Sequence, residues 1–180
     1  MKQFKLTLGF ILLTVGIITF TGCSKYEEGP GISLRSKKSR VVGDWKATAL
    51  TMNGENLLNS TQTDVLDCMS GSSFNYTITG SFSIDWSFDN DGNSTLSSTS
   101  TYNTLDFLNS YEQCTPIYET QTDSGTETYK WDFSSNKEDI VITYSDGTTE
   151  DWHIIELREK QMKLTMNDGT DDYAITLEPR

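Results

Sequence analysis

The chain has 180 residues, with 14 Lys and Arg against 26 Asp and Glu, and a formal net charge of −12. This balance argues against a nucleic-acid partner, because phosphate binding needs clustered Lys and Arg that release counterions. A single histidine argues against a multi-histidine metal site, and the length corresponds to one domain of ordinary size.

The N-terminal segment, residues 1–22, is predicted to be a signal peptide. Lys2 and Lys5 precede an apolar run over residues 6–20, shorter than the roughly 20 residues of a membrane-spanning helix. Phe20-Thr21-Gly22-Cys23 is similar to the bacterial lipobox, with Phe20 where an aliphatic residue is usual. The resemblance implies cleavage before Cys23 and acylation of that residue, which anchors the chain in a membrane. The alternative is an ordinary secreted protein with a free cysteine.

Cys23 and residues 24–40 are expected to form a lipidated, flexible tether. The segment contains Gly29-Pro30-Gly31, lacks apolar periodicity and carries five basic residues against two acidic ones. Its basic end either lies against anionic headgroups or stays solvated. Lys25-Tyr26-Glu27-Glu28 resembles the short acidic signals with which Bacteroidetes send lipoproteins to the outside of the outer membrane. An outer-membrane location is therefore expected, with the cell surface favoured over the periplasmic face.

Residues 41–180 are predicted to form one β domain, beginning with a strand over residues 42–52. From Phe74 to Phe88, apolar and polar residues alternate, as expected for a strand with one face in a core. Gly80 interrupts the apolar series and indicates a bulge or a sharp bend.

The rest of the domain repeats this alternation. Strands are predicted over residues 94–102, 129–133, 140–144, 148–157, 162–166 and 173–177. Short turns rich in Asn, Asp, Ser and Gly make neighbours into hairpin partners. The pattern predicts an all-β, antiparallel up-and-down meander of about eight strands, the number at which a barrel closes. Residues 55–69 and 104–113 do not fit the meander and are expected to form one or two short helices or a lid.

Two cysteines, Cys68 and Cys114, remain once Cys23 is acylated. An even number in an exported chain indicates a disulfide, and the alternative is a pair of buried free thiols. A bridge would pin the two long connections, residues 55–69 and 104–113, together at one end of the barrel.

The start of the first strand carries a family resemblance. Gly43-Asp44-Trp45 has the Gly-x-Trp form of the lipocalin start. With the lipobox, the basic tether, the Trp131 strand and the closing hairpins, the chain resembles the lipocalin-like lipoproteins of Bacteroidetes over residues 41–180. The resemblance implies a lipocalin-like barrel with Trp45 closing one end. The Thr-Asp-Tyr loop motif of lipocalins is missing, and Arg158 and Arg180 are both open as the basic partner of Trp45.

No catalytic residue, cofactor or metal site is assigned. His153 has no accompanying nucleophile elbow, and no carboxylate pair stands out, so no enzyme is expected. Residues 89–93, Asp-Asn-Asp-Gly-Asn, offer oxygen ligands for calcium, but Gly92 is fourth rather than sixth in the loop. A hairpin turn is therefore favoured over a calcium site.

Aromatic residues on the predicted inward faces are the candidates for ligand binding. They are Trp45, Tyr76, Phe82, Trp86, Tyr129, Trp131 and Phe133. Such rings either fill the barrel or line a pocket at its mouth. The first expected function is a membrane-anchored envelope lipoprotein whose barrel binds a small apolar or amphipathic ligand. The second is a non-catalytic structural or interaction module with a filled barrel and a protein or glycan partner.

Overall fold

The computed structural model describes residues 36–180, so the signal peptide, Cys23 and most of the tether lie outside the described residues. The described chain forms two short helices, α2 (Lys37–Val41) and α3 (Phe107–Gln113), and ten strands. The strands are β1 (Gly43–Met52), β2 (Glu55–Asn56), β3 (Asn59–Asp67), β4 (Ser73–Phe88), β5 (Asn93–Leu105), β6 (Tyr118–Phe133), β7 (Asp139–Thr143), β8 (Thr149–Leu157), β9 (Met162–Asn167) and β10 (Asp172–Pro179).

Eight of these strands close into a ring. The order is β1-β10-β9-β8-β7-β6-β5-β4, and residues 43–46 of β1 pair with residues 85–88 of β4 to complete it. Every pair in the ring is antiparallel, and strands adjacent in sequence from β4 to β10 are adjacent in the sheet. The predicted antiparallel meander is confirmed, and its closed part has the predicted number of strands.

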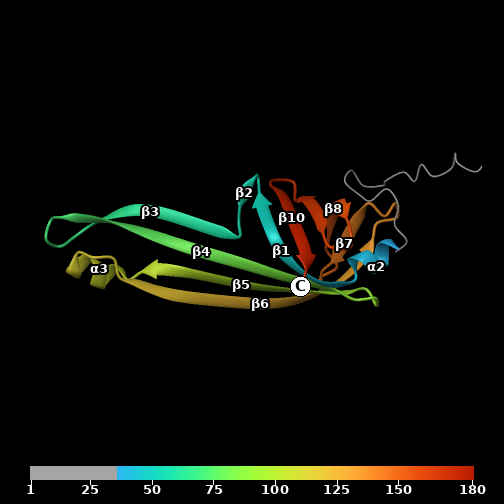
Figure 1. Ribbon diagram of the computed structural model, residues 1–180, viewed down its shortest axis with the longest axis horizontal. Helices are drawn as coiled ribbons and strands as arrows, with labels where there is room; N and C mark the ends of the chain where they lie inside the picture. The colour runs from blue at the N-terminus through green and yellow to red at the C-terminus, as the bar shows by residue number, and fades with distance from the viewer. Residues whose placement is uncertain (1–35) are drawn as a thin grey trace, which may run out of the picture.

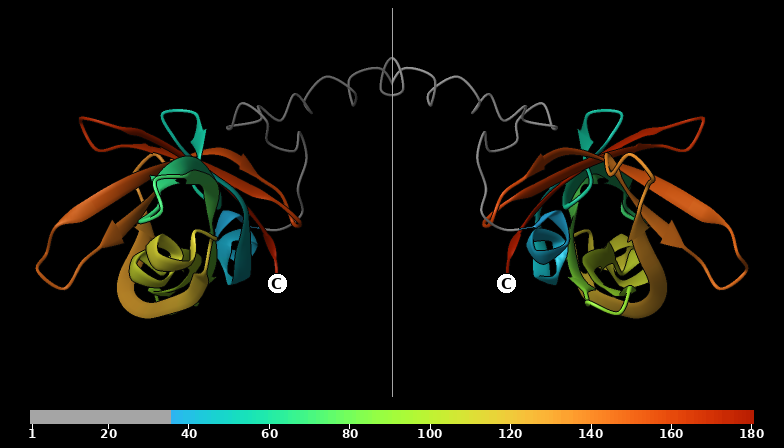
Figure 2. Two further views of the ribbon diagram at one scale, coloured as in Figure 1. Left: turned by 90° about the vertical axis from the view of Figure 1, so that its left-hand side faces the viewer. Right: turned by 90° about the vertical axis from the view of Figure 1, so that its right-hand side faces the viewer.

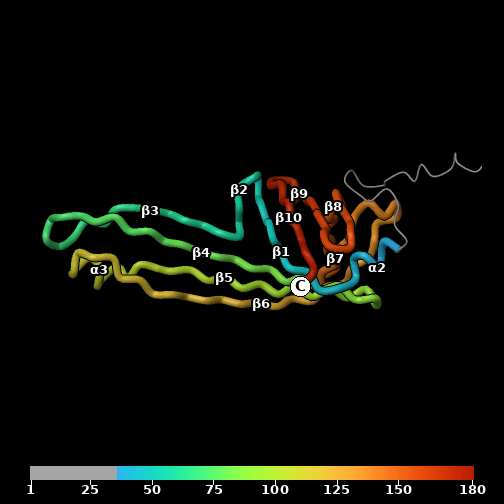
Figure 3. The backbone as a smooth tube through the Cα atoms, viewed as in Figure 1, coloured from blue at the N-terminus to red at the C-terminus, as the bar shows by residue number. Residues whose placement is uncertain are grey.

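Three strands of the ring continue beyond it and form an arm with β3, as Figures 1 and 3 show. We define the arm as residues 59–83 and 99–128. β4 and β6 have 16 residues each, and β3 pairs with the first half of β4. At about 3.3 Å per residue, β6 extends about 35–40 Å before it joins the barrel. The arm leaves one side of the barrel with α3 at its far end, while α2 lies at the opposite end of the molecule.

The hydrophobic core lies in the barrel. Its buried members come from every strand of the ring except β5 and are joined by Val41 of α2; they are Val41, Trp45, Ala47, Leu50, Ile84, Trp86, Phe88, Trp131, Ile140, Ile142, Trp152, Ile154, Leu157, Met162, Leu164, Ile175 and Leu177. In the arm, by contrast, Cys68 and Ser110 alone are buried. Hydrophobic burial therefore stabilises the barrel far more than the arm.

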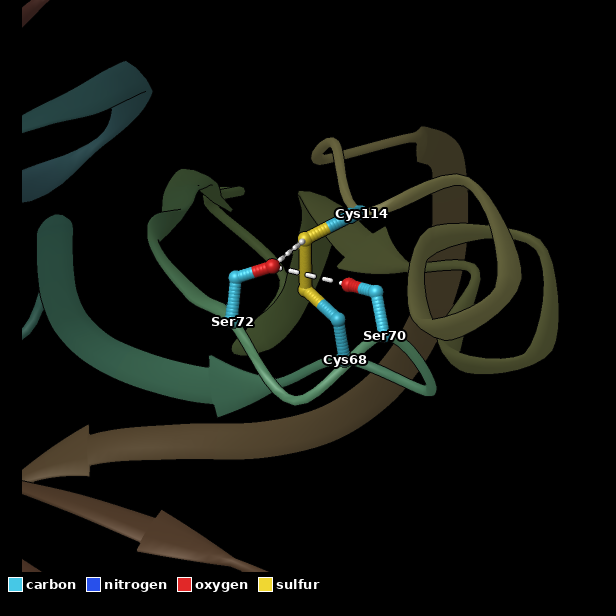
Figure 4. Close-up of a disulfide and its surroundings, with 4 residues drawn as sticks. All are labelled: Cys68, Ser70, Ser72 and Cys114. Carbon is cyan, nitrogen blue, oxygen red and sulfur yellow. Dashed lines mark hydrogen bonds between the residues drawn. A yellow bond between two sulfur atoms is a disulfide. The ribbon is translucent and has the colours of Figure 1, made fainter.

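A disulfide closes the tip of the arm. Cys68 follows β3 and Cys114 follows α3, and their sulfurs are 2.01 Å apart. Ser72 Oγ lies 3.6 Å from Cys114 Sγ and 2.8 Å from Ser70 Oγ (Figure 4). Seen along its long axis, the arm is a curved sheet with α3 at its near end (Figure 2, left). The predicted disulfide and the predicted helix within residues 104–113 are both confirmed.

The prediction of a helix within residues 55–69 is wrong, because these residues form β2 and β3. Thr61, Thr63 and Val65 alternate along β3, and β-branched residues favour strands. The first half of β4 supplies the partner strand. Residues 57 and 58, both Leu, pack against the barrel core between the two strands.

Two further sequence expectations need correction. Residues 37–40, assigned to the flexible tether, belong to α2, where Arg40 Nη1 donates to Leu157 O at 2.7 Å. The bulge indicated by Gly80 is also absent, because the pairing with β3 continues through it without a shift. A Cβ at this position would lie 2.7 Å from Ser60 Oγ, so a larger residue would require the Ser60 side chain to move.

Candidate functional site

The seven candidate aromatics fall into two groups in the structure. Trp45, Trp86 and Trp131 are each 4% exposed and belong to the barrel core. Phe82, Tyr129 and Phe133 are half-buried and pack against that core. Tyr76 lies farther along β4, opposite Asp64 in the arm. Six of the seven therefore contribute to packing of the barrel, including Phe82 at the end of the arm that joins the barrel. Tyr76 alone lies in the arm away from the barrel core.

The core aromatics contact one another directly. Trp86 lies between Trp152 and Phe88, with ring centroids 5.7 Å and 5.0 Å away. Phe88 contacts Trp131 at 5.4 Å, and Trp131 contacts Phe133 at 5.7 Å. Sequence reasoning did not single out Trp152 or Phe88, although their alternation with polar residues marks them as inward-facing. The five rings form a continuous series of contacts, three of them edge to face.

The indole N–H groups of this core all have partners. Trp45 Nε1 donates to Val41 O at 2.8 Å, and Trp86 Nε1 donates to the buried Ser94 Oγ at 2.6 Å. Trp131 Nε1 donates to Asp89 O at 3.1 Å. A buried polar group with a partner costs little, so these three side chains are suited to a permanent core.

A small hollow lies beside Trp45 and Trp86. It measures about 100 Å³, and Arg180 and Asp85 line it as well. Arg180 thus lies beside Trp45, whereas Arg158 pairs with Glu156. Ser87, Thr95 and Ser97 also line it, and they alternate with the inward-facing Trp86 and Leu96, so this hollow lies on the outer face of the barrel.

Larger hollows lie outside the barrel core. One of about 420 Å³ runs over β8, β9, β10 and β1 beside His153, and one of about 510 Å³ crosses the arm beside Gly80. None of the seven candidate aromatics lines either of them, but Trp131 borders a hollow of about 490 Å³ beside Lys38, and Phe133 borders one of about 610 Å³ beside Lys37.

A cluster of tyrosine and glutamate lies where β6 enters the barrel. Tyr129 and Tyr144 contact edge to face at 4.9 Å, and the Tyr129 hydroxyl donates to Glu127. Burial, reinforced by Glu127, raises the pKa of Tyr129 to about 12. Burial, with Glu150 adjacent, also raises the pKa of Tyr144. Both phenols therefore stay protonated as hydrogen-bond donors at physiological pH. No sequence signal identified this cluster, because its members come from three strands.

His153 forms a cross-strand pair on the outer surface. Its Nδ1 lies 2.8 Å from Asp139 Oδ1, and the imidazole is about half exposed. The two residues are directly opposite each other on β7 and β8. The arrangement is that of a surface ion pair, which typically contributes less than about 1 kcal/mol.

A buried carboxylate, missed by the sequence reasoning, lies at a bulge in β8. Glu156 is 1% exposed and contacts Arg158 Nε at 2.5 Å and Lys163 Nζ at 2.8 Å. The pairing with β9 shifts between Ile154 and Glu156, so that Leu157 lies opposite the buried Met162 and Glu156 lies opposite Lys163. Glu156 is therefore on the Lys163 side of the sheet, where Arg158 and Lys163 contact its carboxylate. Alternation from Trp152 and Ile154 predicts Glu156 inside and Leu157 outside, so the sequence pattern could not find this arrangement. The two cationic partners of Glu156 give it a structural role.

The Asp89 to Asn93 segment forms a self-contained turn. Asp89 Oδ1 accepts the N–H groups of Asp91 and Asn93 at 2.8 and 2.7 Å, and Asp89 Oδ2 accepts Asn93 Nδ2. Within residues 36–180, no group of three or more His, Cys, Asp and Glu is arranged to hold a metal ion. Both carboxylate oxygens of Asp89 are engaged in the turn.

Acid is expected to destabilise the protein through such turns. Hydrogen bonds, chiefly from Asn93, Asn109, Thr148 and Asp171 respectively, lower the pKa values of Asp89, Asp106, Asp146 and Asp168. A carboxyl whose pKa is lower in the folded state stabilises the fold above its unfolded value, about 3.9, and loses that contribution as pH falls through the folded value. We expect the melting temperature to fall steeply below about pH 4. The Asp89→Asn variant should show a shallower fall in the same series of thermal melts, and an identical slope would contradict this account.

The large apolar side chains that are exposed gather at the tip of the arm. Among residues 36–180 they are Val65, Met69, Phe107, Leu108 and Tyr118, with Leu108 71% exposed. They come from the end of β3, the following turn, α3 and the start of β6. We call these five residues the tip patch. Clustered exposed apolar side chains on an otherwise polar surface are typical of interaction sites.

The chain was also compared with known proteins. No family model and no curated protein matches it. In the described part of the chain, no helix has the length and apolar character needed to cross a membrane.

Proposed function

We propose that this protein is a lipid-anchored, non-catalytic interaction module of the bacterial cell envelope, in which a filled barrel carries an arm that binds another envelope protein. The observation that carries this proposal is the tip patch. Exposing five large apolar side chains to water is unfavourable unless a partner covers them. Their confinement to the end of the arm indicates the place where that partner binds.

The packing of the barrel supports this function over the binding of an apolar ligand. The candidate rings contact one another and pack with the other buried side chains of the barrel core. A barrel that binds a lipid needs instead an internal space of several hundred Å³.

The position of α2, where the tether joins the barrel, also supports the interaction function. α2, which follows the tether, lies at the opposite end of the molecule from α3 (Figure 1). Lys38 of α2 lies over the Trp131 ring at 5.8 Å, which fixes the helix against the barrel. A chain anchored at Cys23 would therefore direct its arm away from the anchoring point.

The lipocalin-like assignment and the outer-membrane location belong to the same proposal. The ring of eight strands, with Trp45 buried in β1 and Arg180 beside it, is consistent with the lipocalin start. The lipobox at residues 20–23 and the acidic segment that follows it support a lipoprotein at the cell surface.

The test places a photo-crosslinking residue at Leu108 in the tip patch and, as a matched control, at exposed Asp146 in a barrel turn. In cells of the natural host, we expect the Leu108 position alone to give one dominant protein adduct. Adding Phe107→Ser and Met69→Ser should abolish that adduct. Equal labelling from both positions would contradict the proposal. A lipid-sized mass retained in native mass spectrometry would favour ligand binding instead.

A further inference from the structure

One long edge of the arm has no partner within residues 36–180. β6 pairs with β5 from Tyr118 to Lys130, whereas β7 pairs with β6 only from Lys130 to Phe133. All residues of β6 from 118 to 128 are exposed. The side of β6 that faces away from β5 is therefore open along most of the arm.

Hydrogen bonds at the two ends of the β5–β6 ladder indicate which amides face this edge. Trp131 N–H donates to Gly92 O, and Asp106 N–H donates to Ile117 O, both at 2.8 Å. The N–H and C=O groups of successive residues alternate in direction along an antiparallel strand, so the odd-numbered residues of β6 face β5. The outward-facing groups are those of Thr120, Thr122, Ser124, Thr126 and Thr128.

Apart from its acidic side chains, this edge lacks the features that usually prevent strand addition, namely Lys, Pro, bulges and short length. Residues 118–129 contain no Lys, Arg or Pro, and the 13 residue pairs with β5 run without a register shift. Elsewhere in the arm, side chains cover free backbone groups. Where β4 separates from β5, Thr77 N–H donates to the Tyr118 hydroxyl at 2.9 Å, and Thr79 N–H donates to Asn103 Oδ1.

The charges along the edge define the partner. Glu119, Asp123 and Glu127 recur at every fourth residue on one face of β6, and eleven acidic residues but no Lys or Arg lie between Lys46 and Lys130. A second copy paired antiparallel about Asp123 would place carboxylates opposite carboxylates, which is destabilising. A strand with Lys or Arg at alternate positions would instead set opposite charges across the pair.

We propose that the free edge of β6 binds an extended segment of a partner protein, with Lys or Arg at alternate positions, by β-strand addition. The inference rests on the proposed interaction function and adds the binding edge and the chemistry of the partner. Main-chain hydrogen bonds to the even-numbered residues supply affinity, and Glu119, Asp123 and Glu127 supply selectivity. The edge begins at Tyr118, which belongs to the tip patch, so one partner can contact both.

The first test measures amide hydrogen exchange in the purified protein with a twelve-residue peptide of alternating Thr and Lys, at about 150 mM salt to screen non-specific attraction. We expect the even-numbered amides of residues 120–128 to exchange about tenfold more slowly, with little change at the odd-numbered amides, which already bond to β5. A Thr-Glu peptide should have no effect. Equal slowing at even and odd positions would overturn strand addition, as would no binding of the Thr-Lys peptide. Protection of the even amides without peptide would show that a second copy occupies the edge.

The second test compares charge and backbone variants by the Kd of the same peptide. Asp123→Lys should raise the Kd about threefold, while Asp151→Lys, on an exposed position of β8, should not change it. Ser124→Pro removes one outward N–H and should raise the Kd several-fold while β7 to β9 keep their exchange protection. Equal effects of Asp123→Lys and Asp151→Lys would overturn the inference. If these tests fail while the crosslink from Leu108 still forms, the interaction function stands and only the β6 edge is excluded.

Discussion

Reduction of the Cys68–Cys114 disulfide is expected to destabilise the arm by about 4 kcal/mol, the chain-entropy value for a bridge that closes a loop of this length. The arm depends on the bridge because it buries so few side chains, whereas the barrel has its own core. Unfolding of the reduced protein should therefore separate into two transitions. Native-state hydrogen exchange should show loss of protection in β3 and the first half of β4, with β7 to β9 still protected.

The Cys68→Ser, Cys114→Ser double variant should behave like the reduced protein. Ser70→Ala is the matched control, because Ser70 lies beside the bridge without belonging to it (Figure 4), and its effect should stay within about 0.5 kcal/mol. A single cooperative transition with an unchanged midpoint after reduction would contradict the dependence of the arm on the bridge.

Trp86→Ala is expected to lower the free energy of unfolding by about 3–5 kcal/mol. Trp86 contacts Phe88 and Trp152 in the barrel, and its indole N–H donates to Ser94. The substitution leaves a cavity and deprives Ser94 of that hydrogen bond. Urea unfolding followed by circular dichroism measures the loss from the shift of the midpoint.

Phe107→Ala is the matched control for this variant, because Phe107 is a large aromatic residue exposed in the tip patch. Its effect on stability should be within about 0.5 kcal/mol. A loss below about 1 kcal/mol for Trp86→Ala would mean that the barrel tolerates internal space. Such a result would favour an apolar-ligand site after all.

The strand pattern predicted the barrel well because alternation reports directly which side chains face a core. Residues 74–88 were predicted as one strand and form most of β4, and the Asx-Gly turns correctly separated β7 from β8 and β9 from β10. β3 escaped because Thr61 and Thr63 face water on a strand without a buried side chain, so its alternation is between polar residues. For the same reason the predicted strand began at Tyr129, although β6 begins at Tyr118: residues 118–128 are all exposed. A polar strand gives no hydrophobic signal.

The side chains of the candidate site also divide into those that the sequence pattern identified and those that it missed. Sequence placed Trp86 and Trp131 on inward faces, and both are buried. It could not tell packing from a pocket, because that depends on the distances between rings from different strands. Glu156 lies opposite Lys163 because of a bulge, and the Tyr129 cluster needs three strands to meet, so neither has a local pattern.

Sequence alone determined the antiparallel β class and the excess of acid over base that opposes binding of nucleic acid, and it favoured a bridge between Cys68 and Cys114 over two free thiols. Each depends on composition or on alternation between neighbouring residues. The tertiary structure decided that β1 pairs with β4 to close the ring and that aromatic rings fill it. It also decided that β3 to β6 extend as an arm whose tip and β6 edge are exposed. These features arise because residues far apart in the chain meet, and no local pattern records such contacts.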